Sequence, residues 1–109
     1  MLAILKATIY NQFTMNTENN KTILPGISND IAKAMKEKEE LRLSVLRMMK
    51  SKILYVNARG DLPDPEIIKI IAKYAKELKE SIEEAKKVDR PEAAKKTEAE
   101  LKIVEEYLK

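Results

Sequence analysis

The chain has 109 residues, which is enough for one small domain, and its 36% of charged residues with only 2 Gly and 4 Pro favour helices. Because the sequence holds 1 Phe and 0 Trp, a core must be built mainly from aliphatic side chains. The sequence has 0 Cys, which excludes disulfides and thiol chemistry. It also has 0 His, so the commonest general base and metal ligand is absent.

Residues 1–25 differ from the rest because they are poor in charge and rich in Asn and Thr. Their apolar part, Leu2 to Ile9, is far shorter than the ~20 residues that cross a membrane. They lack the basic N-terminal region of a signal peptide. Like a transit peptide they contain few acidic residues, but unlike a typical transit peptide they have no Arg. We expect an N-terminal extension and linker over 1–25, with a short helix or strand at Leu2–Phe13, before a helical domain over 26–109.

This N-terminal composition also bears on location. We expect no contact with a membrane and a cytoplasmic location, or an organelle if residues 1–25 act as a targeting segment.

The first expected helix of the domain spans 27–36. Ser28 is its expected N-cap, because the hydroxyl can accept a hydrogen bond from a free N–H group of the first turn. One face of this helix carries Ile27, Ile31, Ala34 and Met35. The charged run KEKEE at 36–40 then interrupts the apolar pattern. It indicates a corner between two helices, and a solvated turn within one helix is the alternative.

A second helix is expected at 40–57, where apolar residues recur in steps of three and four. This stripe consists of Leu41, Val45, Met48, Met49, Ile53 and Val56. Leu43 and Leu54 lie on a separate side, and a helix that is apolar on more than one side is typical of the centre of a bundle. Gly60 is the expected stop of this helix.

Two further helices are expected at 65–88 and 91–108. Asp64 is the expected cap of the former, with Pro65 at the first helical position. Its apolar stripe consists of Ile67, Ile71, Tyr74, Ala75, Leu78, Ile82 and Ala85. Asp89 then matches a capping box for the last helix. The short connection predicts an antiparallel hairpin at the C-terminus, so the chain as a whole is predicted to be an all-α bundle of about four helices.

Basic residues are concentrated in 26–60, which holds eight Lys and Arg against four Asp and Glu, whereas 61–109 holds eleven against thirteen. An anionic partner would therefore meet the first block, although ordinary solvated helix charge explains it equally well. Seven of these residues are candidate nucleic-acid contacts: Lys36, Lys38, Arg42, Arg47, Lys50, Lys52 and Arg59.

Helical geometry divides the candidates on the second expected helix. Arg42 and Lys52 point toward its apolar stripe, where the alternative is an aliphatic stem buried with the charged head in water. Arg47 and Lys50 point away, and the alternative for Arg47 is an ion pair with a Glu on the last helix. Tyr55 is the single aromatic residue near this block that could stack on a base, so RNA binding would depend on shape and charge.

No residue pattern indicates catalysis. Neighbouring carboxylates such as Glu83 and Glu84, or Glu105 and Glu106, point in different directions on a helix. Glu98 and Glu105 share a face, which a solvated surface explains. We therefore expect no catalytic residue, no metal site, no cofactor and no enzyme activity of the chain on its own.

Three segments together resemble one known family. They are NDIAKAMKEKEELRLSVLRMMKSKI, a short polar loop, and KELKESIEEAKKVDRPEAAKKTEAELKIVEEYL. In this order and spacing the chain resembles the helical first half of the YqeY-like family over about residues 27–108. That family shares a domain with the tail of the B subunit of glutamyl/aspartyl-tRNA amidotransferase. The resemblance implies an all-α bundle, and the second small helical subdomain usual in the family is expected to be absent.

The resemblance also implies a function. The tail domain of the amidotransferase is thought to hold the tRNA body, while the glutamine-dependent carbon–nitrogen ligase reactions occur elsewhere in that complex. We therefore expect a non-catalytic accessory or tRNA-binding module, with tRNA and amidotransferase subunits as partners. The alternative is a helical protein-interaction or self-association module, a homo-oligomer included, in which exposed Met48 and Met49 receive a partner helix.

Overall fold

The computed structural model describes residues 21–109. Within this range it contains four helices and no strand, which confirms the predicted all-α class. The helices are α2 (Ile23–Glu37), α3 (Glu40–Val56), α4 (Asp64–Lys87) and α5 (Pro91–Glu105). The segment expected at Leu2–Phe13 lies outside the described residues. Each helix of residues 21–109 is too short or too polar to cross a membrane.

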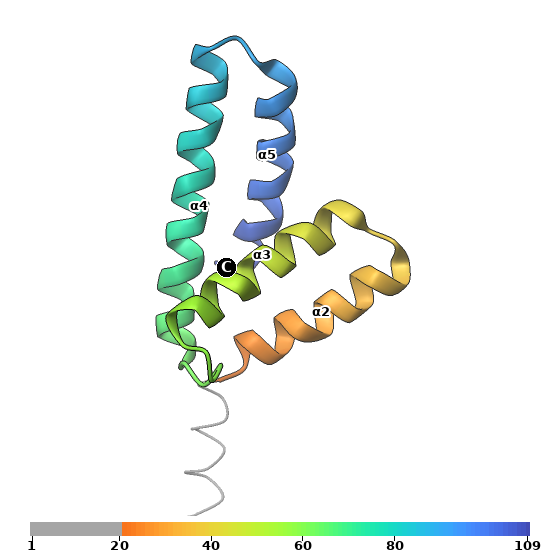
Figure 1. Cartoon of the computed structure of the whole chain (residues 1–109), viewed down its shortest axis with the longest axis vertical. Coiled ribbons are helices and arrows are strands. Elements are labelled where there is room, and N and C mark those ends of the chain that lie inside the picture. Colours follow the sequence, from red (N-terminus) through yellow and green to blue (C-terminus); the bar gives the residue numbers. More distant parts are fainter. Residues whose placement is uncertain (1–20) are drawn as a thin grey trace, which may run out of the picture.

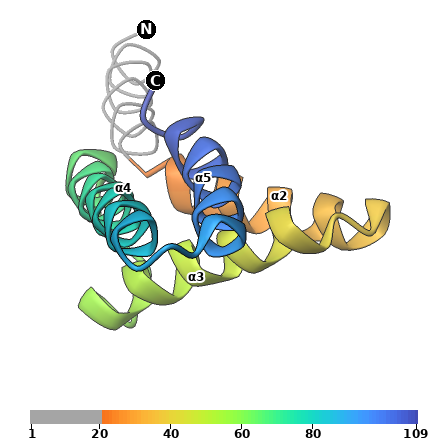
Figure 2. The same ribbon diagram turned by 90° about the horizontal axis from the view of Figure 1, so that it is seen from above.

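The four helices form two antiparallel hairpins (Figure 1). The α4–α5 hairpin confirms the prediction for the C-terminal part of the chain, and the α2–α3 hairpin lies across one end of it. Seen from above, α3 runs across both α4 and α5 (Figure 2). Helix α3 packs against α2, α4 and α5, as its two apolar sides predict for a helix at the centre of a bundle, and α4 likewise contacts the other three helices.

The core is aliphatic, as the composition predicts, and it contains no buried polar or charged residue among those described. The largest side chains that are fully buried are Ile27, Leu46, Met49, Ile53, Ile67, Ile71, Val45 and Val104. They come from all four helices, so the hydrophobic effect holds the two hairpins together as one body. Tyr74 is the one aromatic side chain of residues 21–109 that belongs to this core.

Helix α2 begins at Ile23, earlier than the predicted 27, and this brings Leu24 into the core. The predicted cap Ser28 is therefore inside the helix. The N–H groups of Thr22 and Ile23 instead donate to Asp64 Oδ1, at 2.9 Å and 3.0 Å. The Thr22 hydroxyl donates to Asp64 Oδ2 at 2.6 Å. A carboxylate on α4 thus caps α2, which local sequence patterns do not reveal.

Asp64 therefore has a different role from the predicted one. It is the first residue of α4, whose N-cap is Pro63. Burial acts to raise the pKa of the Asp64 carboxyl, but the hydrogen bonds from Thr22 and Ile23 outweigh it and lower the pKa.

Both hairpin corners are closed by a residue that has a positive φ and is not glycine. Lys38 has φ 59° and Asp89 has φ 55°. After Asp89, the Arg90 N–H donates back to the Ala85 carbonyl at 2.8 Å, and the same arrangement ends α2. The predicted capping box at Asp89 is wrong, because this residue lies in the turn after α4 and the N-cap of α5 is Arg90.

The loop after α3 turns at Gly60, the residue expected to stop that helix. Gly60 has φ 69°, and its N–H donates to the Asn57 carbonyl at 3.0 Å. A Cβ at this position would lie 3.1 Å from Leu24 Cδ2. The positive φ of the loop therefore favours glycine, and a Cβ there would also require the Leu24 side chain to shift slightly.

We predict that Lys38→Gly increases the free energy of unfolding by about 0.5–1 kcal/mol, because glycine adopts a positive φ without strain at its Cβ. Chemical denaturation measures this change. Lys38→Ala is the matched control, since it removes the same charge but keeps the Cβ. If Lys38→Ala stabilised the chain as much as Lys38→Gly, charge and not backbone strain would be the cause.

We predict that Asp64→Ala lowers the free energy of unfolding by about 1 kcal/mol at neutral pH, because it removes the cap of α2. The folded pKa of Asp64 is below its ordinary value of 3.8, so this stabilisation is present above that value and is lost as the pH falls through the folded pKa. Denaturation curves at several pH values should show the two proteins converging in acid. Glu80→Ala, on the exposed middle of α4, is the control and should show no such convergence. A gap between Asp64→Ala and the parent chain that persists in strong acid would contradict the capping role.

Candidate nucleic-acid interface

The seven candidate cations do not form one cluster. Lys36 and Lys38 lie at the corner that ends α2, and Arg59 lies in the loop after α3. The others, Arg42, Arg47, Lys50 and Lys52, are spread along α3. Because α3 has 17 residues and a helix rises 1.5 Å per residue, the corner and the loop are about 25 Å apart. The candidates must therefore be assessed one surface at a time.

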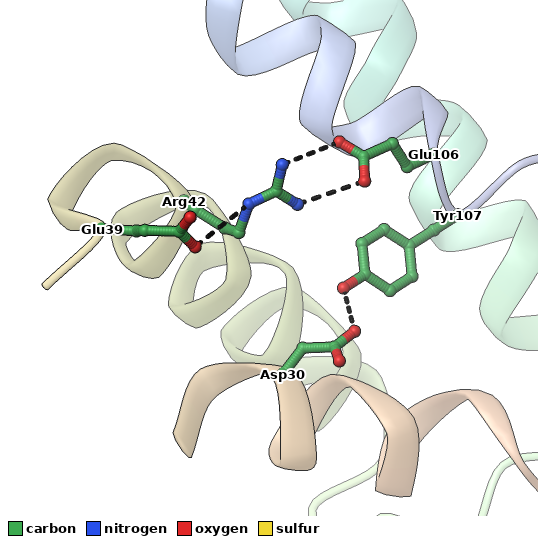
Figure 3. A network of polar contacts seen from close by, with 5 residues as sticks. All are labelled: Asp30, Glu39, Arg42, Glu106 and Tyr107. Carbon is green, nitrogen blue, oxygen red and sulfur yellow. Dashed lines mark hydrogen bonds and ion pairs between the residues drawn. The ribbon is translucent and has the colours of Figure 1, made fainter. Parts of the chain in front are cut away.

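Arg42 is engaged in ion pairs within the chain (Figure 3). Its guanidinium Nη1 and Nη2 donate to Glu106 Oε1 and Oε2, each at 3.1 Å, and Nε lies 3.5 Å from Glu39 Oε2. The hydrogen bond to Glu106 raises the pKa of Arg42. Arg42 therefore joins α3 to the end of α5. An ion pair of this kind was the alternative considered for Arg47, and the sequence assigned it to the wrong arginine.

A second contact beside Arg42 joins α2 to the same end of α5. The Tyr107 hydroxyl donates a hydrogen bond to Asp30 Oδ2 (Figure 3). Burial raises the pKa of Tyr107, and the hydrogen bond to Asp30 raises it further. Both contacts line a cleft of about 480 Å³, which is bounded by Asp30, Lys33, Ala34, Glu37, Glu39, Arg42, Glu106 and Tyr107. Its carboxylates outnumber its cations, so it is unfavourable for a phosphate.

Lys52 is only partly available to a ligand. Its Nζ lies 3.5 Å from Glu77 Oε2 on α4 and 4.9 Å from the centre of the Tyr74 ring. These contacts hold the ammonium group over the junction of α3 and α4, while 30% of the side chain stays exposed. Burial of the aliphatic stem, the alternative for this residue, fits the position that the structure gives it.

Arg47 and Lys50 are the two candidates that the structure brings together on the outer face of α3. With Ser51, Leu54 and Tyr55 they line one shallow hollow. No carboxylate of residues 21–109 lies within 4.0 Å of either charged group. Arg47 also lines a neighbouring hollow, together with Glu40, Leu43, Ser44, Met48 and Ser51. This face has cations whose charge is not neutralised by a close partner in the described part of the chain.

Sequence reasoning missed one basic residue of this surface, Lys73 on α4. It lines a further hollow that also contains Ser51, Lys52, Tyr55, Val56, Ile70 and Glu77. Only the packing of α4 beside α3 places Lys73 next to Tyr55, so the block at 26–60 gave no indication of it. The residues of the Arg42 cluster that were missed, Asp30 and Tyr107 among them, are likewise joined only by the fold.

The methionine pair of α3 divides between core and surface. Met49 is 1% exposed and belongs to the core, so the expectation that it receives a partner helix is wrong. Met48 is 48% exposed and remains on the outer face. Residues that are adjacent on a helix point about 100° apart, which accounts for the division.

The fold and this surface define a small all-α domain built from two helical hairpins, with a basic outer face on its central helix. The chain belongs to the YqeY-like family, because the model of that family, described as Yqey-like protein, matches residues 25–109. This confirms the resemblance that the helical segments indicate. A comparison with curated proteins gives no match.

We predict that Arg42→Ala and Glu106→Ala each destabilise the chain and that a double-mutant cycle between them gives a coupling energy of about 0.5–1 kcal/mol, because the pair is bidentate but half-exposed. Chemical denaturation of the four proteins measures it. The cycle between Arg47→Ala and Glu106→Ala is the control, and we expect a value near zero. Coupling of Glu106 to Arg47 in place of Arg42 would contradict the arrangement in Figure 3.

Proposed function

We propose that this chain is a non-catalytic accessory module of the cytoplasm that binds tRNA through the outer face of α3, in association with glutamine-dependent tRNA amidotransferase chemistry. The observation that carries the proposal is the pair Arg47 and Lys50, which share one exposed hollow without a neutralising carboxylate among residues 21–109. Membership of the YqeY-like family supports it.

Electrostatics favours this face over the others. Arg47 and Lys50 line one hollow beside Tyr55, and Lys52 and Lys73 line the other. Phosphates that lie along this face would release counterions from the RNA, which is the main source of affinity for such ligands. By contrast, Arg42 is neutralised by Glu106, and the cleft near the corner of Lys36 and Lys38 is rich in carboxylates. The proposed contacts are therefore a subset of the seven candidates, extended by Lys73.

The causes of the pKa shifts in the chain support an accessory role. Among residues 21–109, the groups whose pKa is shifted are Arg42, Asp64, Tyr74 and Tyr107. Arg42 and Asp64 hydrogen-bond to residues outside their own helices, Tyr107 just beyond α5 hydrogen-bonds to Asp30 on α2, and Tyr74 lies in the core. Their shifts have structural causes, so in this proposal the amidase and ligase reactions belong to partner subunits.

We predict that the chain binds tRNA with an affinity that falls steeply between about 50 mM and about 200 mM salt. The variant Arg47→Gln/Lys50→Gln should weaken binding and reduce the slope of log affinity against log salt by about 2, one for each phosphate contact. Fluorescence anisotropy with labelled tRNA measures both quantities.

The matched control is Lys95→Gln/Lys96→Gln, which removes the same charge from exposed positions on α5. It should leave the slope nearly unchanged. Binding that is absent, that ignores salt, or that responds equally to both double variants would contradict the proposed surface.

A second candidate function, helical protein interaction or self-association, is favoured by the apolar residues on the same helix. Tyr55, Val56 and Met48 are exposed to 92%, 61% and 48%. An identical chain or an amidotransferase subunit would cover them. A chain that stays monomeric in sedimentation, does not bind isolated amidotransferase subunits and still binds tRNA would argue against this alternative.

A further inference from the structure

Tyr55 lies where two hollows of the surface meet. It is 92% exposed, and it lines both the hollow that contains Arg47, Lys50 and Leu54 and the hollow that contains Lys52, Val56 and Lys73. A single exposed aromatic residue is ordinary on a protein surface. Here, however, a hollow lies on either side of the accessible ring, and charged residues line both hollows.

The residues around Tyr55 carry a strong excess of positive charge. Arg47, Lys50, Lys52 and Lys73 line the two hollows, and Glu77 is the one carboxylate that lines them. Glu77 is itself held by Lys52 at 3.5 Å, so it is not free to repel a ligand at full strength. The surroundings of the ring therefore attract an anion.

The hollow between α3 and α4 also suits a flat, largely apolar group. Its volume is about 390 Å³, and Val56 and Ile70 give it apolar walls. On one side Lys52 is fixed by Glu77 and by the ring of Tyr74, so the basic rim is held in place before a ligand arrives. A phosphate on the rim, a flat ring against Tyr55 and apolar walls are together the requirements of a nucleotide.

We propose that Tyr55 is a stacking platform for one unpaired base, whose flanking phosphates contact Lys50 and Lys73. This inference rests on the proposed function, because it specifies which part of an RNA the outer face of α3 accepts. A base inside a duplex has both faces covered by its neighbours, so the platform selects a single-stranded end, loop or bulge. Stacking is tolerant of sequence, since every base has a π-face.

The test is the affinity of a short single-stranded oligoribonucleotide for the full chain, measured by anisotropy. Tyr55→Ala should weaken binding about tenfold, within the range measured for the loss of one stacked base, and Tyr55→Phe should retain the affinity because it keeps the ring. Neither variant should change the salt slope, because the tyrosine carries no charge. Val88→Ala is the control, because Val88 is exposed and directly follows α4. The corner between α4 and α5 lies at the end of that hairpin away from α3 (Figure 1).

A direct readout comes from Tyr55→Trp, the sole tryptophan of that variant. Stacking should quench its emission when the single-stranded oligoribonucleotide is added, and a duplex of the same sequence should quench it much less. Circular dichroism checks that each variant keeps its helices.

The outcomes separate this inference from the proposed function. Salt-dependent binding that is indifferent to Tyr55→Ala, with no quenching, overturns the platform and leaves the charged surface standing. Absence of salt-dependent binding to any RNA overturns both. A loss upon Tyr55→Ala that appears only for binding of amidotransferase subunits, and not for RNA, assigns the platform to a protein partner and likewise overturns the inference.

Discussion

The packing of α3 against the other three helices is the constraint on which the rest of the structure depends. Val45, Leu46, Met49 and Ile53 are each at most 1% exposed, and α2, α4 and α5 all pack against this helix. These four residues form one buried stripe, so a ligand can reach α3 only on the side that faces away from it. The outer face with Arg47, Lys50 and Tyr55 is thus positioned by the core behind it, and it needs no rearrangement to be presented.

Polar contacts between the hairpins complement this core at its edges. Asp64 on α4 caps α2, while Arg42 and Asp30 on the α2–α3 hairpin contact Glu106 and Tyr107 at the end of α5. None of these groups is fully buried, so each contributes modestly to the free energy of unfolding. Together these contacts orient the two hairpins relative to each other, because hydrogen bonds and bidentate ion pairs are directional and aliphatic packing is not.

The sequence predicts the helices well because their information is local. The stripe from Ile67 to Ile82 is complete within one helix, and the structure buries both ends of it. Predictions fail where the partner is distant in the sequence. Asp64 caps a helix that begins 41 residues earlier, and Arg42 rather than Arg47 meets Glu106, 64 residues away. Periodicity alone says which side a residue is on, and it cannot say which helix occupies that side. For the same reason Lys73 is absent from the seven candidates, whereas the predicted outward direction of Arg47 and Lys50 on α3 agrees with their place in a surface hollow.

The proposed functions depend on two different properties of one face, and the difference has a consequence. Charges that contact phosphates act over several ångströms and tolerate sliding along the RNA backbone, whereas stacking on Tyr55 requires one base at one position. A surface with cations alone would hold any anionic polymer in many registers. One aromatic platform would restrict the register without reading base edges, which fits the proposed binding of tRNAs that differ in sequence but share a common shape. In this proposal the packing of α3 against three helices supports the restriction, because a platform on a loosely held helix would follow the RNA instead of fixing its position.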